Sequence, residues 1–470
     1  MSVDTNNAAF QDALNLIQYT RQSVFLTGKA GTGKSTFLRY VCENTKKKHV
    51  VLAPTGIAAI NAGGSTMHSF FKLPFYPLLP DDPNLSLQRG RIHEFFKYTK
   101  PHRKLLEQIE LVIIDEISMV RADIIDAIDR ILRVYSHNLR EPFGGKQLLL
   151  VGDVFQLEPV VKNDEREILN RFYPTPYFFS ARVFGQIDLV SIELQKVYRQ
   201  TDPVFVGVLD HIRNNTAGAA DLQLLNTRYG SQIEESEADM YITLATRRDT
   251  VDSINEKKLA ELPGDPITFE GVIEGDFPES SLPTSQELVL KPGAQIIFIK
   301  NDFDRRWVNG TIGVIAGIDE EEETIYVITD DGKECDVKRE SWRNIRYRYN
   351  EKTKEIEEEV LGSFTQYPIR LAWAITVHKS QGLTFSRVVI DFTGGVFAGG
   401  QAYVALSRCT SLDGIQLKKP INRADVFVRP EIVNFAGRFN DRQAIDKALK
   451  QAQADVQYAA ASRRSEERRV

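Results

Sequence analysis

A glycine-rich loop between an apolar run and a helical pattern constrains the fold of this chain more than any other feature. Residues 24–41 read VFLTGKAGTGKSTFLRYV, and the stretch from Gly28 to Ser35 has the spacing G-x-x-x-x-G-K-[ST]. The glycines let backbone N–H groups turn inward around phosphate oxygens, and the helix that follows directs the positive end of its dipole at them. A strand, such a loop and a helix in succession predict a nucleotide-binding α/β domain.

Two side chains of the loop, and two acids further on, have predicted roles in nucleotide chemistry. Lys34 is expected to reach the β- and γ-phosphates of ATP, and the Ser35 hydroxyl to ligate Mg²⁺. In LVIIDEIS, Asp115 ends an apolar run and is expected to hold the same metal through water. Glu116 beside it can accept a proton from an attacking water, so the pair indicates hydrolysis. The alternative is a strand that ends in acids for solubility.

Three other side chains, which lie further along the chain, are also candidates for roles in this reaction. In LLLVGDVFQLEPV, Gln156 is placed to hydrogen-bond a γ-phosphate or the lytic water, although a glutamine after a strand is usually a surface residue. Arg199 in LQKVYRQ and Arg408 in AYVALSRCT are candidates to stabilise the leaving oxygens, although an arginine is by default a solvated charge. If both arginines reach from a second domain, closure of the two domains would depend on ATP.

The apolar runs of the first part of the chain predict its architecture. SVFLTG, HVVLAP, LVIIDE and QLLLVGD alternate with helical patterns such as RADIIDAIDRILRVY. Continuous aliphatic strands that alternate with helices imply a parallel sheet covered on both faces. Ligands of such sheets bind beyond the carboxyl ends of the strands, which is where Gly28, Asp115 and Asp153 fall.

With 470 residues the chain is too long for one core and predicts two to four domains. A stretch rich in proline and aromatic residues predicts a small insertion in the first domain. A second α/β region pauses near residue 270, and the short strands that follow, with their turn signals, predict an inserted β-barrel. The predicted boundaries are 1–190 for the first domain with its insertion at about 71–100, 191–270 and 362–436 for the second, 271–361 for the barrel and 437–470 for a charged helical tail.

Composition limits the setting of the protein. The formal net charge of −5 predicts no overall attraction to nucleic acid or to anionic membranes, although it allows a local basic groove. Cys42, Cys335 and Cys409 fit neither a disulfide framework nor a zinc spacing. No apolar run approaches the roughly 20 residues that span a bilayer, and the start of the chain resembles neither a signal nor a transit peptide. We expect a soluble intracellular protein that does not enter membranes.

Taken in order, the motifs resemble those of superfamily-one helicases. The series is GKAGTGKS, APTGIAAINAGGSTMHSFF, IIDEISMV, VGDVFQLEPV, VYRQ, TVHKSQGLTFSRVVID and YVALSRCTS. DEISMVRADIIDAIDRILR resembles the signature of the Pif-type (petite integration frequency) DNA helicases, and WVNGTIGVI, from Trp307 to Ile315, resembles a segment that they share with RecD-like helicases. The resemblance covers residues 8 to about 412.

This resemblance implies a fold and an activity. The fold is α/β, with two RecA-like P-loop domains, a small wedge insertion in the first and an SH3-like β-barrel inserted in the second. The activity is ATP-driven movement along single-stranded DNA in the 5′-to-3′ direction, with unwinding of duplex at single-strand/double-strand junctions. Whether forked DNA, an RNA–DNA hybrid or a G-quadruplex is preferred stays open.

The resemblance also assigns residues. Lys34, Ser35, Asp115, Glu116, Gln156, Arg199 and Arg408 match the family's ATPase positions. Gln11, 17 positions before Gly28, is the candidate adenine-reading glutamine, although its context AAFQDAL departs from the usual leucine-led form. The predicted contacts to ATP are Gln11, Gly28, Ala30, Gly31, Thr32, Gly33, Lys34, Ser35, Thr36 and Gln381.

The predicted contacts to DNA come from two stretches, and they are Thr55, Gly56, His68, Ser69, Phe70, His378, Lys379 and Ser380. The hydroxyl, small, aromatic and basic residues of these stretches independently suit phosphate contacts and base stacking without sequence readout. For Phe70 and Phe71, packing in the core is an equally good alternative. The proline-rich KLPFYPLLP is either a rigid wedge at the fork or an ordinary packed loop.

The leading hypothesis is a translocating DNA helicase with ATP and Mg²⁺ as cofactors and single-stranded DNA as partner. A RecD-like or RNA-directed translocase is the alternative in the same chemistry, against which the DEISMV continuation argues. A nucleotide-gated DNA-binding switch is disfavoured by Glu116, Arg199 and Arg408, and a P-loop kinase by the lack of an acceptor lid. We expect a monomer free in solution and, because the long N-terminal extension of eukaryotic members is not seen, a bacterial or phage-like cytoplasmic protein.

Overall fold

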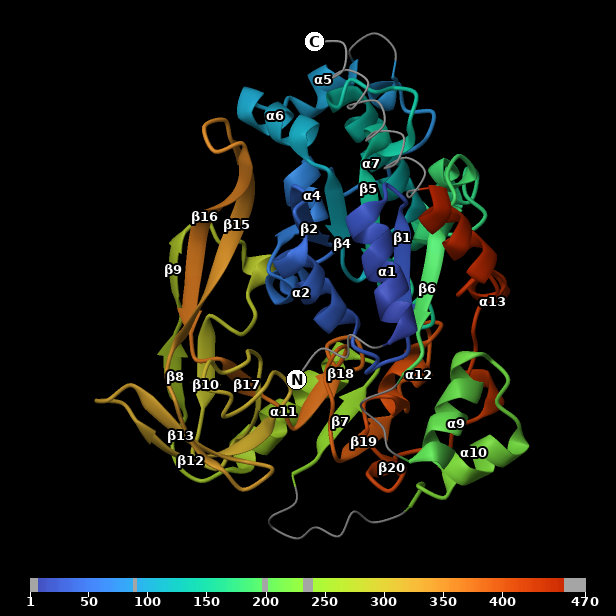
Figure 1. Cartoon of the computed structure of the whole chain (residues 1–470). Coiled ribbons are helices and arrows are strands. Elements are labelled where there is room, and N and C mark those ends of the chain that lie inside the picture. Colours follow the sequence, from blue (N-terminus) through green and yellow to red (C-terminus); the bar gives the residue numbers. More distant parts are fainter. Residues whose placement is uncertain (1–6, 88–90, 197–201, 231–239, 452–470) are drawn as a thin grey trace, which may run out of the picture.

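The first domain is built on a parallel sheet in this computed structural model, which describes residues 7–87, 91–196, 202–230 and 240–451. The strands of the sheet lie in the order β3-β2-β4-β5-β1-β6 (Figure 1). Parallel neighbours require crossover connections, so strands alternate with helices along the chain, as the apolar runs predict. The strands are β1 (Val24–Gly28), β2 (His49–Ala53), β3 (Ser65–Thr66), β4 (Leu111–Ile114), β5 (Gln147–Val151) and β6 (Val190–Leu194).

Both faces of this sheet are buried, which explains the uninterrupted aliphatic text of its strands. In β4, Leu111 and Ile113 belong to one hydrophobic cluster, and Val112 and Ile114 belong to another. Successive side chains of a strand point to opposite faces, so each face of β4 contributes to a different core. One cluster includes residues of α1 (Ala8–Tyr19) and α2 (Lys34–Asn44), and the other includes residues of α4 (Met67–Phe71), α6 (Lys100–Gln108) and α7 (Ala122–Tyr135).

The insertion between residues 71 and 100 packs onto the first domain. Leu78, Leu85 and Tyr98 enter its core, whereas Phe75 and Tyr76 are 85% and 52% exposed. Its regular elements are η1 (Pro83–Leu85) and α5 (Arg91–Phe96). The insertion therefore presents aromatic rings to solvent, and its role as a wedge stays a prediction.

The second domain is a smaller parallel sheet in the order β18-β7-β19-β20. Its core includes Leu209 of α9, Leu244 of β7 and Val404 of α12. Segments far apart in sequence thus form one domain, because the chain leaves after α11 and returns at β18. The strands are β7 (Ile242–Ala245), β18 (Ala374–Thr376), β19 (Val388–Asp391) and β20 (Ile415–Leu417), and the helices are α9 (Pro203–Arg213), α10 (Ala219–Asn226), α11 (Arg248–Glu261) and α12 (Gln401–Leu406).

An antiparallel β-module lies between α11 and β18. Its sheets have the orders β14-β13-β12-β11-β17, β15-β16-β9 and β10-β8. The module runs from Ile267 to Leu371, so its first and last strands lie outside the predicted 271–361. Strand β8 was hidden by the proline, glycine and acidic residues around ITFE, which read as a linker. The strands are β8 (Ile267–Glu270), β9 (Val272–Gly275), β10 (Glu287–Leu290), β11 (Gln295–Phe298), β12 (Ile312–Asp319), β13 (Thr324–Thr329), β14 (Glu334–Val337), β15 (Glu340–Asn350), β16 (Glu355–Gln366) and β17 (Ile369–Leu371).

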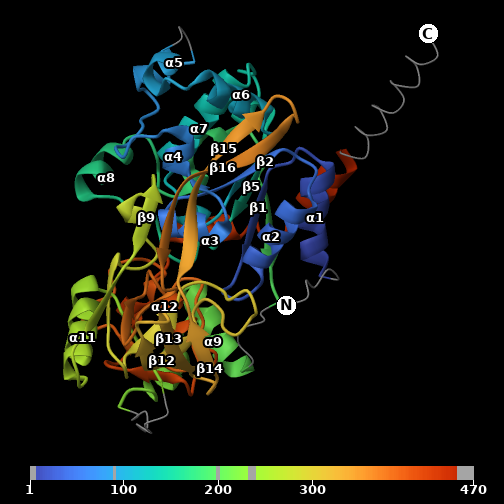
Figure 2. The same ribbon diagram turned by 90° about the vertical axis from the view of Figure 1, so that its left-hand side faces the viewer.

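The long β15–β16 hairpin connects this module to the first domain. Figure 1 shows the hairpin beside α2, α4 and α6, and Figure 2 shows it across the face of the first domain. The Tyr347 hydroxyl accepts a hydrogen bond from the Val51 backbone N–H at 3.2 Å, and the Lys48 ammonium lies 5.5 Å from the centre of the Tyr349 ring. The module is therefore in contact with both domains.

The carboxyl-terminal segment returns to the first domain. α13 (Pro430–Ala436) places Phe435 against Phe25 of β1, with ring centres 5.6 Å apart. Residues 442–451 are helical, and Ile445 joins the core beneath α1 and α2. The second domain was expected to extend to 436, but its packing ends near Val426, because the apolar face of α13 is covered by the first domain.

The remaining short elements connect these layers. In the described ranges, no helix combines the length and the apolar character that crossing a membrane requires. The connecting elements are α3 (Gly56–Ala62), η2 (Ile117–Met119), η3 (Pro142–Gly145), α8 (Asn163–Leu169), η4 (Phe178–Ser180), η5 (Arg182–Gly185), η6 (Glu279–Ser281) and η7 (Arg423–Asp425).

Candidate functional site

The glycine-rich loop joins β1 to α2 at the carboxyl edge of the first sheet. A Cβ atom at Gly28 would lie 2.7 Å from the Leu194 carbonyl oxygen, so only glycine fits where the loop leaves β1. Gly33 has φ 90° and is the N-cap of α2, a left-handed conformation that glycine adopts without strain. The Lys34 ammonium donates to the carbonyl oxygens of Gly28 at 2.7 Å and Lys29 at 3.0 Å. The loop therefore curls around its own lysine, with the exposed Ser35 following it.

The acid pair follows β4 at the same edge. The Asp115 carboxylate accepts a hydrogen bond from the Glu116 backbone N–H at 2.9 Å, and Glu116 has φ 52° and ψ 42°. A left-handed non-glycine residue costs about 1–3 kcal/mol, which marks this turn as strained. Burial raises the pKa of Asp115. Burial and the Asp115 charge raise the pKa of Glu116 to about 7, against the opposing effects of Lys34 and Arg408. A carboxylate with a pKa near neutrality is suited to accept a proton from water.

Gln156 is held beside this pair by contacts from both domains. Its side-chain Nε2 donates to the buried Asp153 carboxylate at 3.3 Å, and its Oε1 accepts from Gln381 Nε2 at 3.1 Å. Gly400 approaches it so closely that a Cβ there would lie 2.2 Å from the Gln156 carbonyl oxygen. Two predicted residues from distant parts of the chain, Gln156 and Gln381, are thus in direct contact.

The second domain also touches the phosphate-binding loop itself. The hydroxyl of Tyr403, on α12, accepts a hydrogen bond from the Ala30 N–H at 3.3 Å, and burial raises the pKa of Tyr403 to about 12. The Lys29 ammonium pairs with the Asp210 carboxylate of α9 at 2.5 Å. The loop that is predicted to hold the phosphates is therefore part of the domain interface.

Of the two predicted arginines, the structure describes only Arg408. Arg408 follows α12, is 1% exposed, and donates from Nε to the Val404 carbonyl oxygen at 2.9 Å and from Nη2 to the Ser407 hydroxyl at 2.9 Å. Its charge acts to lower the pKa of Glu116, so it lies close enough to the acid pair to act on it electrostatically. Arg199 lies outside the described residues.

Two buried side chains at this edge are absent from the predicted site. Arg213 reaches from α9 between the carboxylates of Asp153 and Glu193, at 3.2 Å and 2.8 Å. Tyr403 is the second. The sequence pattern that could have identified Arg213 is its helical spacing. It lies four residues after Leu209, on the apolar face of α9. A cation on an apolar stripe requires a buried counter-ion.

Gln11 lies in the first turn of α1, where its N–H bonds to the carbonyl oxygen of Asn7. Its neighbour Phe10 packs against Phe37 of the loop helix α2, with ring centres 4.8 Å apart. Gln11 is therefore on the helix that flanks α2, and its role as the adenine reader stays a prediction.

The first predicted DNA stretch presents polar groups and buries one of its aromatic rings. Thr55 and Ser69 are exposed, and the Thr55 hydroxyl caps α3 by accepting from the Ala58 N–H at 3.2 Å. Gly56 faces Ser281 of the β-module, because a Cβ there would lie 2.1 Å from its hydroxyl oxygen. Phe70, predicted as a DNA contact, is 4% exposed and packs on Phe71 and Tyr347. For Phe70 the core alternative is the one observed, because its ring has no open face for a base.

His68 stands in a different setting on the same helix. Its ring is stacked on that of the exposed Phe75, with centres 5.0 Å apart and planes at 8°. Burial lowers the pKa of His68, and the nearby Arg121 adds to the effect. A neutral histidine beside an exposed aromatic ring is compatible with a base or sugar contact.

The second predicted stretch follows β18. Lys379 is exposed and His378 partly buried, whereas Ser380 is fully buried and its hydroxyl donates to the Val377 carbonyl oxygen at 2.7 Å. The Ser380 side chain was predicted to contact DNA, but it is used inside the protein. Burial lowers the pKa of Lys379, followed by the charges of Arg370 and Arg248, so this edge is locally basic. The Nε atom of Arg370 is buried and has no hydrogen-bond partner among the described residues.

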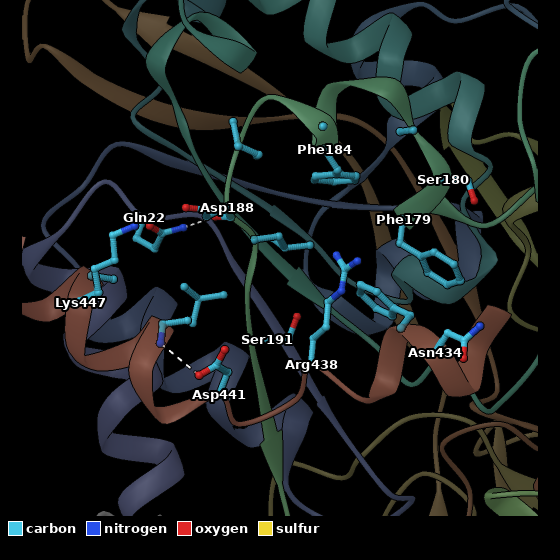
Figure 3. Close-up of a pocket in the computed structure, with 18 of the residues that line it drawn as sticks. Gln22, Phe179, Ser180, Phe184, Asp188, Ser191, Asn434, Arg438, Asp441 and Lys447 are labelled. Carbon is cyan, nitrogen blue, oxygen red and sulfur yellow. Dashed lines mark hydrogen bonds between the residues drawn. The ribbon is translucent and has the colours of Figure 1, made fainter. Parts of the chain in front are cut away.

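A cavity of about 880 Å³ lies elsewhere, at the amino ends of β1 and β6 (Figure 3). It is lined by Gln22, Phe179, Asp188, Phe435 and Arg438 among others. None of the predicted site residues lines it, so the candidate reaction centre is the domain interface and not this cavity.

Comparisons with known proteins identify the family. The model of the PIF1-like helicase family matches residues 4–212. The ATP-dependent DNA helicase Pif1 of Campylobacter jejuni is 33% identical over 412 residues, covering 84% of this chain and 88% of the relative. That of Bdellovibrio bacteriovorus is 31% identical over 439 residues, covering 91% and 90%. The crystal structure of Bacteroides sp Pif1 in complex with ADP-AlF4 superposes with a TM-score of 0.85 at 41% identity, covering 93% of this chain and 97% of that chain.

This chain belongs to the PIF1-like family of ATP-dependent DNA helicases. Its fold is that of the solved Pif1 helicases, so the prediction of an α/β protein with two RecA-like domains is confirmed. Two further Bacteroides structures, unliganded Pif1 and Pif1 bound to ssDNA, have TM-scores of 0.82 and 0.64 to this chain.

Proposed function

We propose that this protein hydrolyses ATP between its two RecA-like domains and uses the cycle to move along single-stranded DNA from 5′ to 3′, unwinding duplex ahead. The observation that carries the proposal is the set of contacts from the second domain to the nucleotide edge of the first. Tyr403 bonds the phosphate-binding loop at Ala30, Gln381 bonds Gln156, and the charge of Arg408 acts to lower the pKa of Glu116. A nucleotide bound at this edge would change how the two domains contact each other. A stepping motor requires such a link between nucleotide state and domain arrangement.

The nucleotide chemistry follows from the residues of the edge. Lys34 carries the charge that the β- and γ-phosphates require, and Glu116 accepts the proton of the attacking water. The Gln156 amide orients that water or a γ-phosphate oxygen, while Arg408, and Arg199 by the same prediction, stabilise charge on the leaving oxygens.

The donor set also suits a divalent metal. Ser35 supplies a hydroxyl and Asp115 a carboxylate, which are the hard oxygen ligands that Mg²⁺ takes together with phosphates and water. Bound Mg²⁺ would neutralise charge on the phosphate oxygens. In the described part of the chain no cluster of three or more His, Cys, Asp or Glu residues gathers, so Ser35 and Asp115 are the proposed protein ligands.

The DNA path is proposed from the exposed and partly buried polar groups of the two stretches. Thr55, His68 and Ser69 come from the first domain, and His378 and Lys379 from the second. Bacteroides Pif1 has been solved with ssDNA, and with forked dsDNA unwound by two coordinating helicases. We propose ssDNA and its junctions with duplex as the ligands here too, with the 71–100 insertion as the wedge and the β-module as an SH3-like barrel.

We further propose, as the resemblance to bacterial members of the family implies, that the protein works in the cytoplasm and is a monomer when free. Two copies at a fork are compatible with this, because each copy would bind through DNA.

The proposal is tested by measuring ATP turnover with and without a single-stranded oligonucleotide, then unwinding of partial duplexes with a 5′ or a 3′ overhang. We expect turnover to be stimulated by DNA and only the 5′-overhang substrate to be opened. Unwinding from the 3′ overhang alone would reverse the direction, and turnover indifferent to DNA would overturn the motor.

A further inference from the structure

A continuous path of polar contacts crosses the domain interface beside the phosphate-binding loop. Arg213 of the second domain donates from Nη2 to the Asp153 carboxylate of the first at 3.2 Å. The same carboxylate accepts from Gln156 Nε2 at 3.3 Å, and Gln156 Oε1 accepts from Gln381 of the second domain at 3.1 Å. Gln156 is therefore held between two groups whose positions depend on how the domains meet.

Arg213 is buried in a way that ties its position to this arrangement. Its side chain is 4% exposed and that of Asp153 is 0% exposed. The guanidinium also lies 2.8 Å from the Glu193 carboxylate and 4.3 Å from the centre of the Phe155 ring. A buried cation is costly unless it is paired, and all three partners belong to the first domain. The pairing exists only while α9 is seated against the ends of β5 and β6.

Asp153 determines which way the Gln156 amide points. An ionised carboxylate only accepts hydrogen bonds, so it selects the NH₂ end of the amide and leaves the carbonyl end for Gln381. Asp153 is itself held by the Phe155 N–H at 3.1 Å. The amide retains a second N–H and a second lone pair, which are the groups needed for a phosphate oxygen and a water. Its orientation thus depends on a carboxylate whose counter-ion comes from the other domain.

We propose that Arg213 is a positioning residue, which couples the seating of the second domain to the orientation of the Gln156 amide through Asp153. It acts without touching the nucleotide, and it differs in this from Arg408, which we propose stabilises charge on the leaving oxygens. The inference rests on the proposed function, because it assigns Gln156 its part in hydrolysis.

The competing explanation is a purely structural ion pair. Replacing Arg213 by glutamine leaves Asp153 buried without its counter-ion, which lowers stability under either explanation. The double variant Arg213→Gln/Asp153→Asn removes both charges and separates the two. An asparagine amide both donates and accepts, so it no longer selects one end of Gln156. A structural pair would be repaired in both stability and turnover, whereas a positioning pair would be repaired in stability alone.

The experiment compares the full-length chain with Arg213→Gln, Arg213→Lys, the double variant and the control Arg228→Gln. Arg228 also lies on the second domain and donates to the backbone oxygens of Ile415 and Asp413, so its loss breaks contacts within that domain. Each protein is measured for melting temperature, for kcat and KM of the DNA-stimulated ATPase, and for ssDNA affinity with and without ADP-AlF4.

We expect Arg213→Gln to lower the stimulated kcat by about 30-fold, with the KM for ATP within about threefold of the wild type. The ratio of ssDNA affinities with and without ADP-AlF4 should fall toward one. Coupling between two ligands is reciprocal, so a variant that no longer couples nucleotide binding to domain seating also loses the effect of nucleotide on ssDNA binding. Arg213→Lys should recover part of kcat, since lysine keeps the charge but not the forked donor geometry. The double variant should regain melting temperature and not kcat.

A wild-type kcat in Arg213→Gln, a full recovery of kcat in the double variant, or an equal loss in Arg228→Gln would each overturn the inference while leaving the proposed function in place. A wild-type protein without DNA-stimulated turnover would overturn both.

Discussion

The proposed nucleotide edge and the two stretches proposed to contact DNA, here called the DNA-facing stretches, are built in opposite ways. At the nucleotide edge, Gln156, Tyr403 and Arg408 are buried and each is bonded to a fixed partner. Along the DNA-facing stretches, Thr55, Ser69 and Lys379 are exposed. Hydrolysis requires groups held to within a fraction of an ångström, whereas a strand that must slide requires contacts that form and break readily. Substitutions at the nucleotide edge should therefore lower ATP turnover, whereas substitutions in the DNA-facing stretches should weaken ssDNA binding.

The largest effect is expected at the phosphate-binding loop. Lys34→Ala removes the charge that we propose binds the β- and γ-phosphates, and it should lower ATP turnover by at least about 100-fold. Phosphate release in the presence of ssDNA measures it, and ssDNA affinity without nucleotide serves as the control, which should stay within about twofold. Turnover near the wild type would show that this loop does not hold the phosphates.

Phe70 offers the next test, because it separates packing from DNA contact. Phe70→Ala should lower the free energy of unfolding by about 3–5 kcal/mol, since it opens a cavity between Phe71 and Tyr347. Phe75→Ala is the matched control at an 85% exposed ring and should change stability by less than about 0.5 kcal/mol. Denaturant unfolding measures both, and equal stabilities would place Phe70 outside the core.

Arg408→Ala should lower the DNA-stimulated kcat by about 100-fold while sparing ATP binding. The proposed charge on the leaving oxygens is lost, whereas the phosphate contacts proposed for the glycine-rich loop are unchanged. A fluorescent nucleotide gives the affinity and a coupled assay gives the rate. Because Arg408 is buried, the melting temperature of Arg408→Ala must be compared with that of Arg408→Lys. Unchanged hydrolysis in Arg408→Ala would rule out the proposed role of Arg408 in stabilising the leaving oxygens.

The smallest effects are expected on the DNA side. His378→Ala and Lys379→Ala should each weaken ssDNA binding by about three- to tenfold and leave ATP binding unchanged. Loss of Lys379 should also reduce the salt dependence of binding by about one phosphate contact, since one cation fewer releases counter-ions, and loss of His378 should not. Titrations at several salt concentrations measure both, and an equal loss of ATP and DNA affinity would argue against a strand contact.

The sequence was most informative where chemistry demands fixed spacing. The glycine-rich loop and the acid pair are short contiguous patterns that follow apolar strands, so their placement at one sheet edge follows from the α/β alternation alone. Arg213 and Tyr403 could not be found in this way, because their partners lie far along the chain and meet them only when the domains pack. Nor does a motif reveal which side chains face inward, and so Phe70 and Ser380 were assigned to DNA although the fold buries them.

The β15–β16 hairpin has a mechanical consequence. Its first strand has 11 residues, which at about 3.3 Å each makes an arm of roughly 36 Å attached at one end. Tyr347 lies about 23 Å along this arm, so a turn of about ten degrees at the attached end would displace it by roughly 4 Å by simple geometry, which is more than the Tyr347–Val51 hydrogen bond tolerates. Because Tyr347 is buried against Phe70 in the core of the first domain, reorientation of the β-module strains its contact with β2, the strand that ends two residues before Thr55.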